Sequence, residues 1–315
     1  MKYWLQRIPQ FIFSCYDNLQ VIKNLFTTKI PINTNNLSCN PLIIVSSGRS
    51  GTTLLRVMLT KNSKLSIPPE SQFFHKALRK FISYHYLGWE ELIKIVIGEL
   101  ESKRIFNYWD INLAPVYYEL KNLEKSQRSL AKIIDSVYLQ FLKEKNPMAE
   151  IWGDKSPIHT YHLNLVHRIF PNAYYIHLIR DGRAAVNSMI ERNYLNNSID
   201  KACKRWNNSI NDFRKFKAKH GSDKLIEIKY ENLVQNPQKE LKRICDKINI
   251  PFEKQMLDPQ KSINKYGDTK LKHHKNLKNP VNTQSIDKWE NQLSEKEKKL
   301  ITTKLRKNLT ILGYI

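Results

Sequence analysis

The stretch LIIVSSGRSGTTLLRVML, residues 42–59, decides the fold class of this chain. Four apolar residues, typical of a buried strand, lead into a loop of Ser, Gly, Arg and Thr and then into a helical pattern. The helix is expected to begin near Gly51 and to present on one face Leu54, Leu55, Met58 and Leu59. A strand that runs through such a loop into the start of a helix is typical of a phosphate site, because the free backbone amides there attract an anion.

This loop has the residues of an anion site but lacks the lysine of a nucleotide-hydrolysing loop. Gly48 and Gly51 permit tight turns, and Arg49 adds a positive charge. The backbone amides expected to face the anion belong to Ser50, Gly51, Thr52 and Thr53. In a Walker A loop, GxxxxGK[ST], a lysine reaches the terminal phosphates, and here Thr52 stands in its place. The alternative is an ordinary strand–turn–helix connection.

The rest of the chain alternates between strand and helix patterns. Apolar segments at 173–179 and 224–230 predict further strands, and helical periodicity fills most of 73–145. The alternation predicts an α/β protein with a P-loop-type three-layer fold, in which helices flank a central, mostly parallel β-sheet and residues 73–145 form a helical insert. We divide the chain into an N-terminal extension, residues 1–40, and a single domain, residues 41–315.

The stretch LIRDGRAAVNSMIERN, residues 178–193, predicts a second anion site at the same edge of the sheet. Arg180 ends a buried strand, where a guanidinium needs an anionic partner, and a phosphate accepts it bidentately. Ser188 lies two helical turns further on, and Arg192 follows one turn later on the same helix face. The alternative is a salt-bridge network of Arg180 or Arg183 with Asp181 beside the helix start.

Two anion sites at one sheet edge fit a ligand with two separate phosphate groups. In this arrangement the chain resembles the sulfotransferases that use 3′-phosphoadenosine 5′-phosphosulfate (PAPS), above all the branch with the protein-tyrosine sulfotransferases and their bacterial relatives. The resemblance rests on GRSGTTLLR at 48–56, RDGRAAVNSM at 180–189 and KYENLVQNPQKELKRICDKINIPF at 229–252. It covers roughly residues 41–70 and 150–289.

The resemblance implies direct in-line transfer of a sulfuryl group from PAPS to an acceptor hydroxyl, without a metal ion. It implies that the loop from Arg49 to Thr53 holds the 5′-phosphosulfate. Arg180 and Ser188 would hold the 3′-phosphate, and Arg192 would add a third donor beside them. A sulfuryl group carries less charge than a phosphoryl group, so the missing Walker lysine is expected for this reaction.

Later residues complete the predicted donor site. Tyr230 closes the strand pattern KLIEIKY and is expected to pack on the nucleotide or hydrogen-bond to it, with a core position as the alternative. Ser285 and Lys288 lie in NTQSIDKWENQLS, residues 282–294, which resembles the family's late KW stretch on the side of the 3′-phosphate.

Two further residues fit the chemistry of the transfer. Glu70 follows two prolines in SIPPESQFF, and the resemblance implies that it is the general base for the acceptor hydroxyl, with His75 as the alternative base. Lys155, in WGDKSP, resembles the family's lysine that stabilises charge on the bridging oxygen as the sulfuryl group leaves, with Asp154 to orient it. A solvated carboxylate and a plain surface turn are the alternatives for Glu70 and Lys155.

Two other classes of function compete with this interpretation, one suggested by the net charge and one by the α/β architecture. The formal net charge of +23 favours a polyanionic partner, but the basic residues are dispersed, so no nucleic-acid binding is expected. The other rival, a P-loop kinase or NTPase, would need the loop lysine and an acidic residue for magnesium. His159 and His162 share a helix face without a carboxylate or cysteine at matching spacing, so we predict no metal site.

The acceptor class stays open among sugars, lipids, other small molecules and tyrosine. The aromatic residues of 73–145 are expected either to shape the acceptor pocket or to be core. The basic stretch NKYGDTKLKHHKNLKNP, residues 264–280, is predicted to be a lid or a plain surface loop.

No apolar run approaches the ~20 residues that span a bilayer, and four scattered cysteines fit a reducing compartment. We therefore expect no transmembrane segment and a cytoplasmic protein. Residues 4–26 are expected to pack on the domain or to contact a membrane surface as a basic interfacial helix. Nothing in the sequence indicates an oligomeric state.

Overall fold

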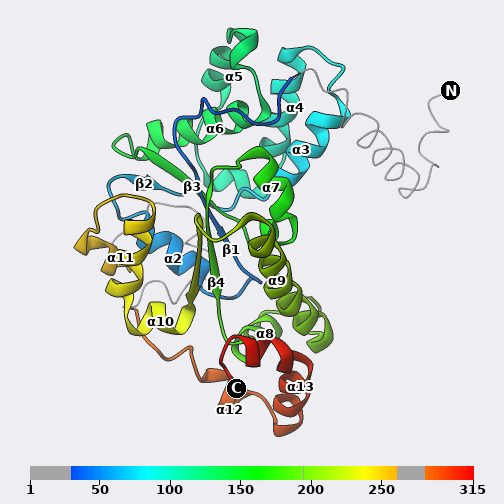
Figure 1. Ribbon diagram of the computed structural model, residues 1–315, viewed down its shortest axis with the longest axis vertical. Helices are drawn as coiled ribbons and strands as arrows, with labels where there is room; N and C mark the ends of the chain where they lie inside the picture. The colour runs from blue at the N-terminus through cyan, green and yellow to red at the C-terminus, as the bar shows by residue number, and fades with distance from the viewer. Residues whose placement is uncertain (1–29, 194, 261–280) are drawn as a thin grey trace, which may run out of the picture.

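A central parallel β-sheet organises the protein. The computed structural model describes residues 30–193, 195–260 and 281–315 (Figure 1). Within these residues five strands pair in the order β2-β3-β1-β4-β5, and all four pairings are parallel. The strands are β1 (Leu42–Val45), β2 (Leu65–Ser66), β3 (Ile151–Lys155), β4 (Tyr174–Ile179) and β5 (Leu225–Lys229). The predicted α/β fold with a mostly parallel sheet is confirmed.

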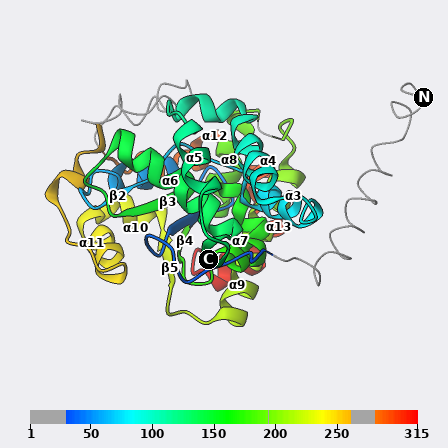
Figure 2. The same cartoon turned by 90° about the horizontal axis from the view of Figure 1, so that it is seen from above.

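Helices cover both faces of the sheet (Figures 1 and 2), and successive residues of β1 pack alternately against the two helical layers. Leu42 and Ile44 pack in one core with the helices α2 (Thr52–Leu59), α10 (Tyr230–Gln235) and α11 (Pro237–Lys247). Ile43 and Val45 pack in the other core, whose helices include α3 (Phe74–Ser83), α6 (Leu130–Lys145), α7 (Leu163–Ile169) and α9 (Ile199–His220). Because a parallel sheet covered on both faces is apolar on both, β1 reads as a continuous hydrophobic run in the sequence.

Residues 74–145 are mainly helical, as the periodicity predicts. Besides α3 and α6 they form α4 (Trp89–Glu101) and α5 (Ala114–Lys121), with the short helices η2 (Arg104–Tyr108) and η3 (Lys125–Gln127). The described part of the N-terminal extension, residues 30–40, packs on this core, and the amide of Leu130 donates to the carbonyl of Pro31 at 3.1 Å. The domain boundaries themselves stay a prediction.

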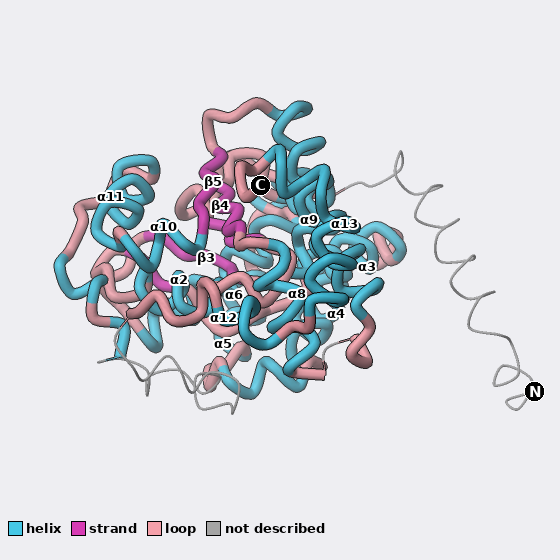
Figure 3. The backbone as a smooth tube through the Cα atoms, turned by 90° about the horizontal axis from the view of Figure 1, so that it is seen from below, coloured by secondary structure: helices cyan, strands magenta, loops and turns pink. Residues whose placement is uncertain are grey.

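A third core lies beyond the carboxyl ends of the strands (Figures 1 and 3). It joins α8 (Gly182–Glu191) and α9 to α12 (Lys288–Gln292) and α13 (Glu295–Ile311). Ser294 and Glu297 form the capping box at the start of α13. The short helices η4 (Pro157–His162) and η5 (Lys254–Leu257) complete the described elements. This core brings the late part of the chain to the edge of the sheet where the predicted anion sites lie.

Within the described residues no helix is long and apolar enough to span a membrane. Two predicted segments, the interfacial helix at 4–26 and the basic stretch at 264–280, lie outside the described residues.

Candidate active site

The loop between β1 and α2 has three residues with positive φ. The φ angles are 85° at Gly48, 56° at Arg49 and 88° at Gly51. A Cβ atom on Gly51 would lie 2.6 Å from Cε2 of Tyr230. Any other residue at this position would therefore strain the backbone and displace the Tyr230 ring. Tyr230, predicted as the last strand residue, is instead the first residue of α10.

Arg180 follows β4 and is only 9% exposed. Its Nη1 donates to the carbonyl of Arg49 at 3.1 Å, and its Nη2 donates to the carbonyl of Ser285. The guanidinium carbon lies 4.9 Å from the centre of the Tyr230 ring, and the buried Nε has no hydrogen-bond partner among the described atoms. Burial lowers the pKa of Arg180, because water no longer solvates the charge.

Among the described residues, the alternative of a salt-bridge network at this helix start holds for Arg183 and not for Arg180. Asp181 pairs with Arg183 at 2.6 Å and accepts a hydrogen bond from its backbone amide at 2.8 Å, which caps α8. Arg180 thus keeps its charge directed at the cavity rather than at its neighbour.

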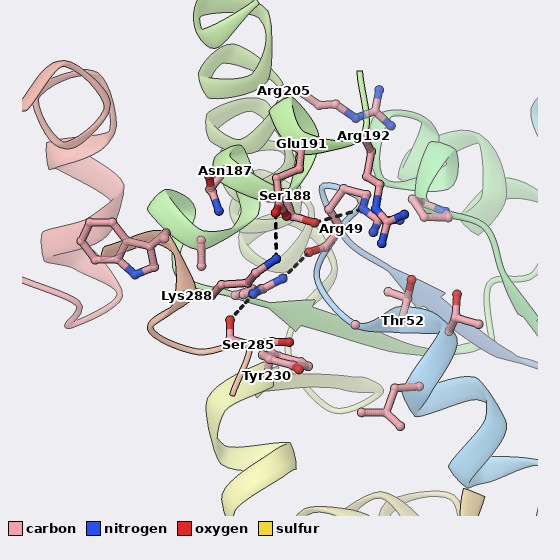
Figure 4. A pocket seen from close by; sticks show the side chains of 18 of the residues that line it. Arg49, Thr52, Asn187, Ser188, Glu191, Arg192, Arg205, Tyr230, Ser285 and Lys288 are labelled. Atoms are coloured by element: carbon pink, nitrogen blue, oxygen red, sulfur yellow. Dashed lines mark hydrogen bonds and ion pairs between the residues drawn. The ribbon is translucent and has the colours of Figure 1, made fainter. Parts of the chain in front are cut away.

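The predicted donor residues converge from four segments (Figure 4). Arg49 Nε donates to the hydroxyl of Ser188 at 3.3 Å. Lys288, from α12, pairs with Glu191 of α8 at 2.7 Å. Arg192 follows at the end of α8 and lines the same cavity. Residues far apart in the sequence therefore form one strongly basic wall.

Lys155 and Glu70 form an ion pair beside the loop. Lys155 Nζ lies 2.6 Å from Glu70 Oε1 and 3.3 Å from the hydroxyl of Thr53. The side chain of Gln72 donates to the other Glu70 oxygen at 2.6 Å. Ser156 Oγ accepts the two backbone amides that follow Glu70, each at 3.1 Å. The loop with the carboxylate is thus fixed to the strand that carries the lysine.

The prediction that Asp154 orients Lys155 is wrong. Neighbouring strand residues point to opposite faces, and Asp154 faces the helical core instead. It accepts a hydrogen bond from Tyr138 at 2.7 Å and lies 3.1 Å from Nε2 of His159. Burial acts to raise the pKa of Asp154, but His159 and Tyr138 outweigh it and hold the pKa below its usual value.

His75, the alternative base, lies away from the cavity. It is 7% exposed and stacks on His162 with ring centres 4.1 Å apart. Burial, with repulsion from His162, lowers the pKa of His75 to about 3. His75 is not among the residues that line the cavity.

A cavity of about 930 Å³ joins the basic wall to the ion pair. Eleven of the thirteen predicted site residues line it: Arg49, Gly51, Thr52, Thr53, Glu70, Arg180, Ser188, Arg192, Tyr230, Ser285 and Lys288. The other two, Ser50 and Lys155, are buried just behind the lining, at 1% exposure each. The sequence motifs therefore describe one physical site.

The structure adds residues to the site that the motifs missed. Arg205 of α9 lines the cavity and donates to the carbonyl of Ser47 at 2.9 Å, and Asn187 and Trp289 line it as well. No motif around Arg205 indicates this role. None of residues 73–145 lines this cavity, and the expectation that they shape the acceptor pocket stays a prediction. Trp89 and Trp109 are core residues.

Comparison with known proteins identifies the family. A model of the Sulfotransferase family matches residues 41–254, about two thirds of the chain. The chain belongs to this family. It is a sulfotransferase and not a P-loop kinase or NTPase. The match ends before α12 and α13, so the segment that supplies Ser285 and Lys288 lies beyond it.

Named relatives agree with the family. A putative protein-tyrosine sulfotransferase of Caenorhabditis elegans is 31% identical over 58% of this chain and 72% of its own length. The protein-tyrosine sulfotransferase of Drosophila melanogaster is 25% identical over 80% of this chain, which spans only 48% of that protein. Among solved structures, the sulfotransferase domain of the Synechococcus PCC 7002 olefin synthase is 25% identical, with a TM-score of 0.60 over 90% of this chain and 98% of that domain.

Among the described residues, no three His, Cys, Asp or Glu side chains gather as metal ligands. The prediction that catalysis needs no metal stays a prediction.

Proposed function

We propose that this sulfotransferase transfers a sulfuryl group from PAPS to the hydroxyl group of an acceptor by direct in-line displacement. One observation supports this most: a single cavity is lined both by a basic wall with Arg180 and Ser188 and by Glu70, whose carboxylate pairs with Lys155. A donor with phosphate groups at the 3′ and 5′ positions of its ribose and a hydroxyl acceptor together need both features.

The residues of the basic wall fit the donor. Arg180 is buried, and its Nε has no hydrogen-bond partner within the described part of the chain, which suits it to bind a phosphate. Ser188 and Lys288 are beside it, and the Tyr230 ring offers an apolar face next to the loop. The volume of about 930 Å³ is of the size that ligand sites commonly have. The loop from Arg49 to Thr53 would hold the 5′-phosphosulfate.

In the proposed reaction the acceptor oxygen forms a bond to sulfur while the bond from sulfur to the bridging phosphate oxygen breaks. Glu70 takes the acceptor proton, and the electron pair of the broken bond leaves on 3′-phosphoadenosine 5′-phosphate. Lys155, next to Thr53 at 3.3 Å, is placed to stabilise that negative charge. Since the chain holds both groups in fixed positions, catalysis rests on positioning and electrostatics.

Glu70 suits the role of base better than His75. Glu70 lines the cavity, whereas His75 is buried beside His162, away from it. Both oxygens of Glu70 already accept a hydrogen bond, from Lys155 and Gln72, and each oxygen keeps a second lone pair for the acceptor hydroxyl.

The acceptor would be a small molecule, a glycan, a lipid or a tyrosine. The Drosophila relative is a protein-tyrosine sulfotransferase by name, but this chain spans less than half of it, so tyrosine is only one of the candidates.

Calorimetric titration tests the donor. We expect 3′-phosphoadenosine 5′-phosphate to bind without magnesium and more tightly than AMP or ATP, and Arg180→Ala to weaken it by about 10- to 100-fold. Arg128→Ala is a matched control, because Arg128 also donates to a backbone carbonyl, at 2.9 Å, and lies over the ring of Trp89, outside the cavity. Binding of ATP alone, and only with magnesium, would contradict the proposal. Transfer of radioactive sulfate from PAPS to a panel of hydroxyl compounds then identifies the acceptor.

A further inference from the structure

The segment after α13 returns to the loop that carries Arg180. Tyr314 follows the helix and lies outside the part of the chain that the family model matches. Its hydroxyl donates to Glu231 Oε2 at 2.8 Å. Glu231, in the first turn of α10, accepts the backbone amide of Asp181 on its other oxygen at 2.9 Å. One carboxylate therefore joins the end of the chain to the residue after Arg180.

These contacts fix the peptide group that joins Arg180 to Asp181. The carbonyl of Arg180 accepts from Trp206 Nε1 at 3.0 Å, and the next amide, that of Asp181, is held by Glu231. The carbonyl of Tyr314 in turn accepts from Arg183 at 3.4 Å. Because this peptide group is held at both its carbonyl and its amide, the backbone directly after Arg180 is fixed, and this restricts the direction of the Arg180 side chain.

Tyr314 is suited to hold Glu231 in place. Burial and the adjacent carboxylate raise the pKa of Tyr314, so its hydroxyl stays protonated and donates. A carboxylate that accepts two hydrogen bonds loses its rotational freedom, whereas Glu231 with only the Asp181 amide could turn toward solvent. The Arg180 loop would then lose its fixed acceptor.

We propose that Glu231 and Tyr314 are positioning residues for the donor site. They act through Arg180 and set the affinity of the enzyme for the 3′-phosphate. This inference rests on the proposed function, since it takes the group at Arg180 to be that phosphate. It assigns a binding role to a part of the chain beyond the family match.

Titration of the full chain with two probes tests the inference. 3′-Phosphoadenosine 5′-phosphate and AMP differ only in the 3′-phosphate, so the ratio of their affinities reports on that subsite alone. We expect Tyr314→Phe to weaken the binding of the bisphosphate by about tenfold and to leave AMP unchanged. Tyr117→Phe is the control: Tyr117 also donates to a glutamate, Glu90, at 2.8 Å, but it lies outside the cavity.

A second arm separates positioning from a general structural effect. If Tyr314 acts through Arg180, Tyr314→Phe causes no further loss in an Arg180→Ala background. An affinity ratio in Tyr314→Phe equal to that of the wild type would overturn the inference, and so would losses that add in the double variant. A wild-type protein that does not distinguish the two probes would instead overturn the proposed function, and this inference with it.

Discussion

Replacing His177 by leucine should change how the stability of the protein depends on pH. His177 lies on β4, 2% exposed, stacked on Phe213 of α9 with ring centres 4.2 Å apart. Neither ring nitrogen has a hydrogen-bond partner among the described atoms. Burial alone lowers the pKa of His177 from 6.5 to about 3, because nothing around it compensates the charged form.

The sign and size follow from linkage. The unfolded chain binds a proton at His177 as the pH falls through 6.5, while the folded protein stays neutral there until the pH approaches about 3. Stability is therefore lost on acidification between these two values. From pH 7 to pH 5, His177 alone lowers the free energy of unfolding by about 2 kcal/mol. Leucine removes this loss, since it does not titrate.

Urea unfolding of both proteins at pH 7 and pH 5 measures the difference. Other buried histidines, such as His75, contribute equally to both proteins and cancel in the comparison. The stability of His177→Leu relative to the wild type should rise by about 2 kcal/mol at the lower pH. Parallel losses in the two proteins would refute the reasoning, because His177 would then titrate alike in the folded and unfolded states.

Three further substitutions probe the site and the fold. Gly51→Ala should weaken binding of 3′-phosphoadenosine 5′-phosphate and lower the free energy of unfolding by about 2–4 kcal/mol, from backbone strain and displacement of Tyr230, as calorimetry and urea unfolding would detect. Lys155→Met should slow single-turnover transfer by about 10²–10³-fold, whereas unchanged transfer would remove it from the mechanism. Ser294→Ala should cost about 1 kcal/mol of stability in thermal unfolding without altering nucleotide binding, and a change in binding would contradict its purely structural role.

The sequence alone predicted those parts of the site whose residues lie close together in the chain. The loop at 48–53 and the spacing from Arg180 to Ser188 each lie within one strand–loop–helix unit, where backbone geometry relates the residues directly. Because parallel strands end at one edge, the two units had to meet there, and they do. The late residues Ser285 and Lys288 came from family resemblance, and the cavity contains both.

Contacts between residues far apart in the sequence could not be predicted from local motifs. Asp154 was predicted to orient Lys155 because the two residues are adjacent in the sequence. Adjacent residues of a strand point to opposite faces of the sheet, however, so their side chains lie apart. Glu70 is the actual partner, 85 residues away. Arg205 contacts the loop from the second turn of the long helix α9, and only the packing of α9 on the rest of the protein determines which helix face lies toward the cavity. The aromatic composition of residues 73–145 is compatible both with a ligand pocket and with a hydrophobic core, so composition alone does not distinguish the two.

Assembly of the cavity from Gly48 to Trp289 has a consequence for synthesis of the protein. A ribosome makes the loop at Thr53 long before Lys288, and at about 5–20 residues per second the 235 residues between them take roughly 12–47 s. During that interval the nascent sheet has no complete cavity. A ligand of this cavity therefore cannot assist the early steps of folding, and the chain must reach a stable sheet through its own apolar contacts.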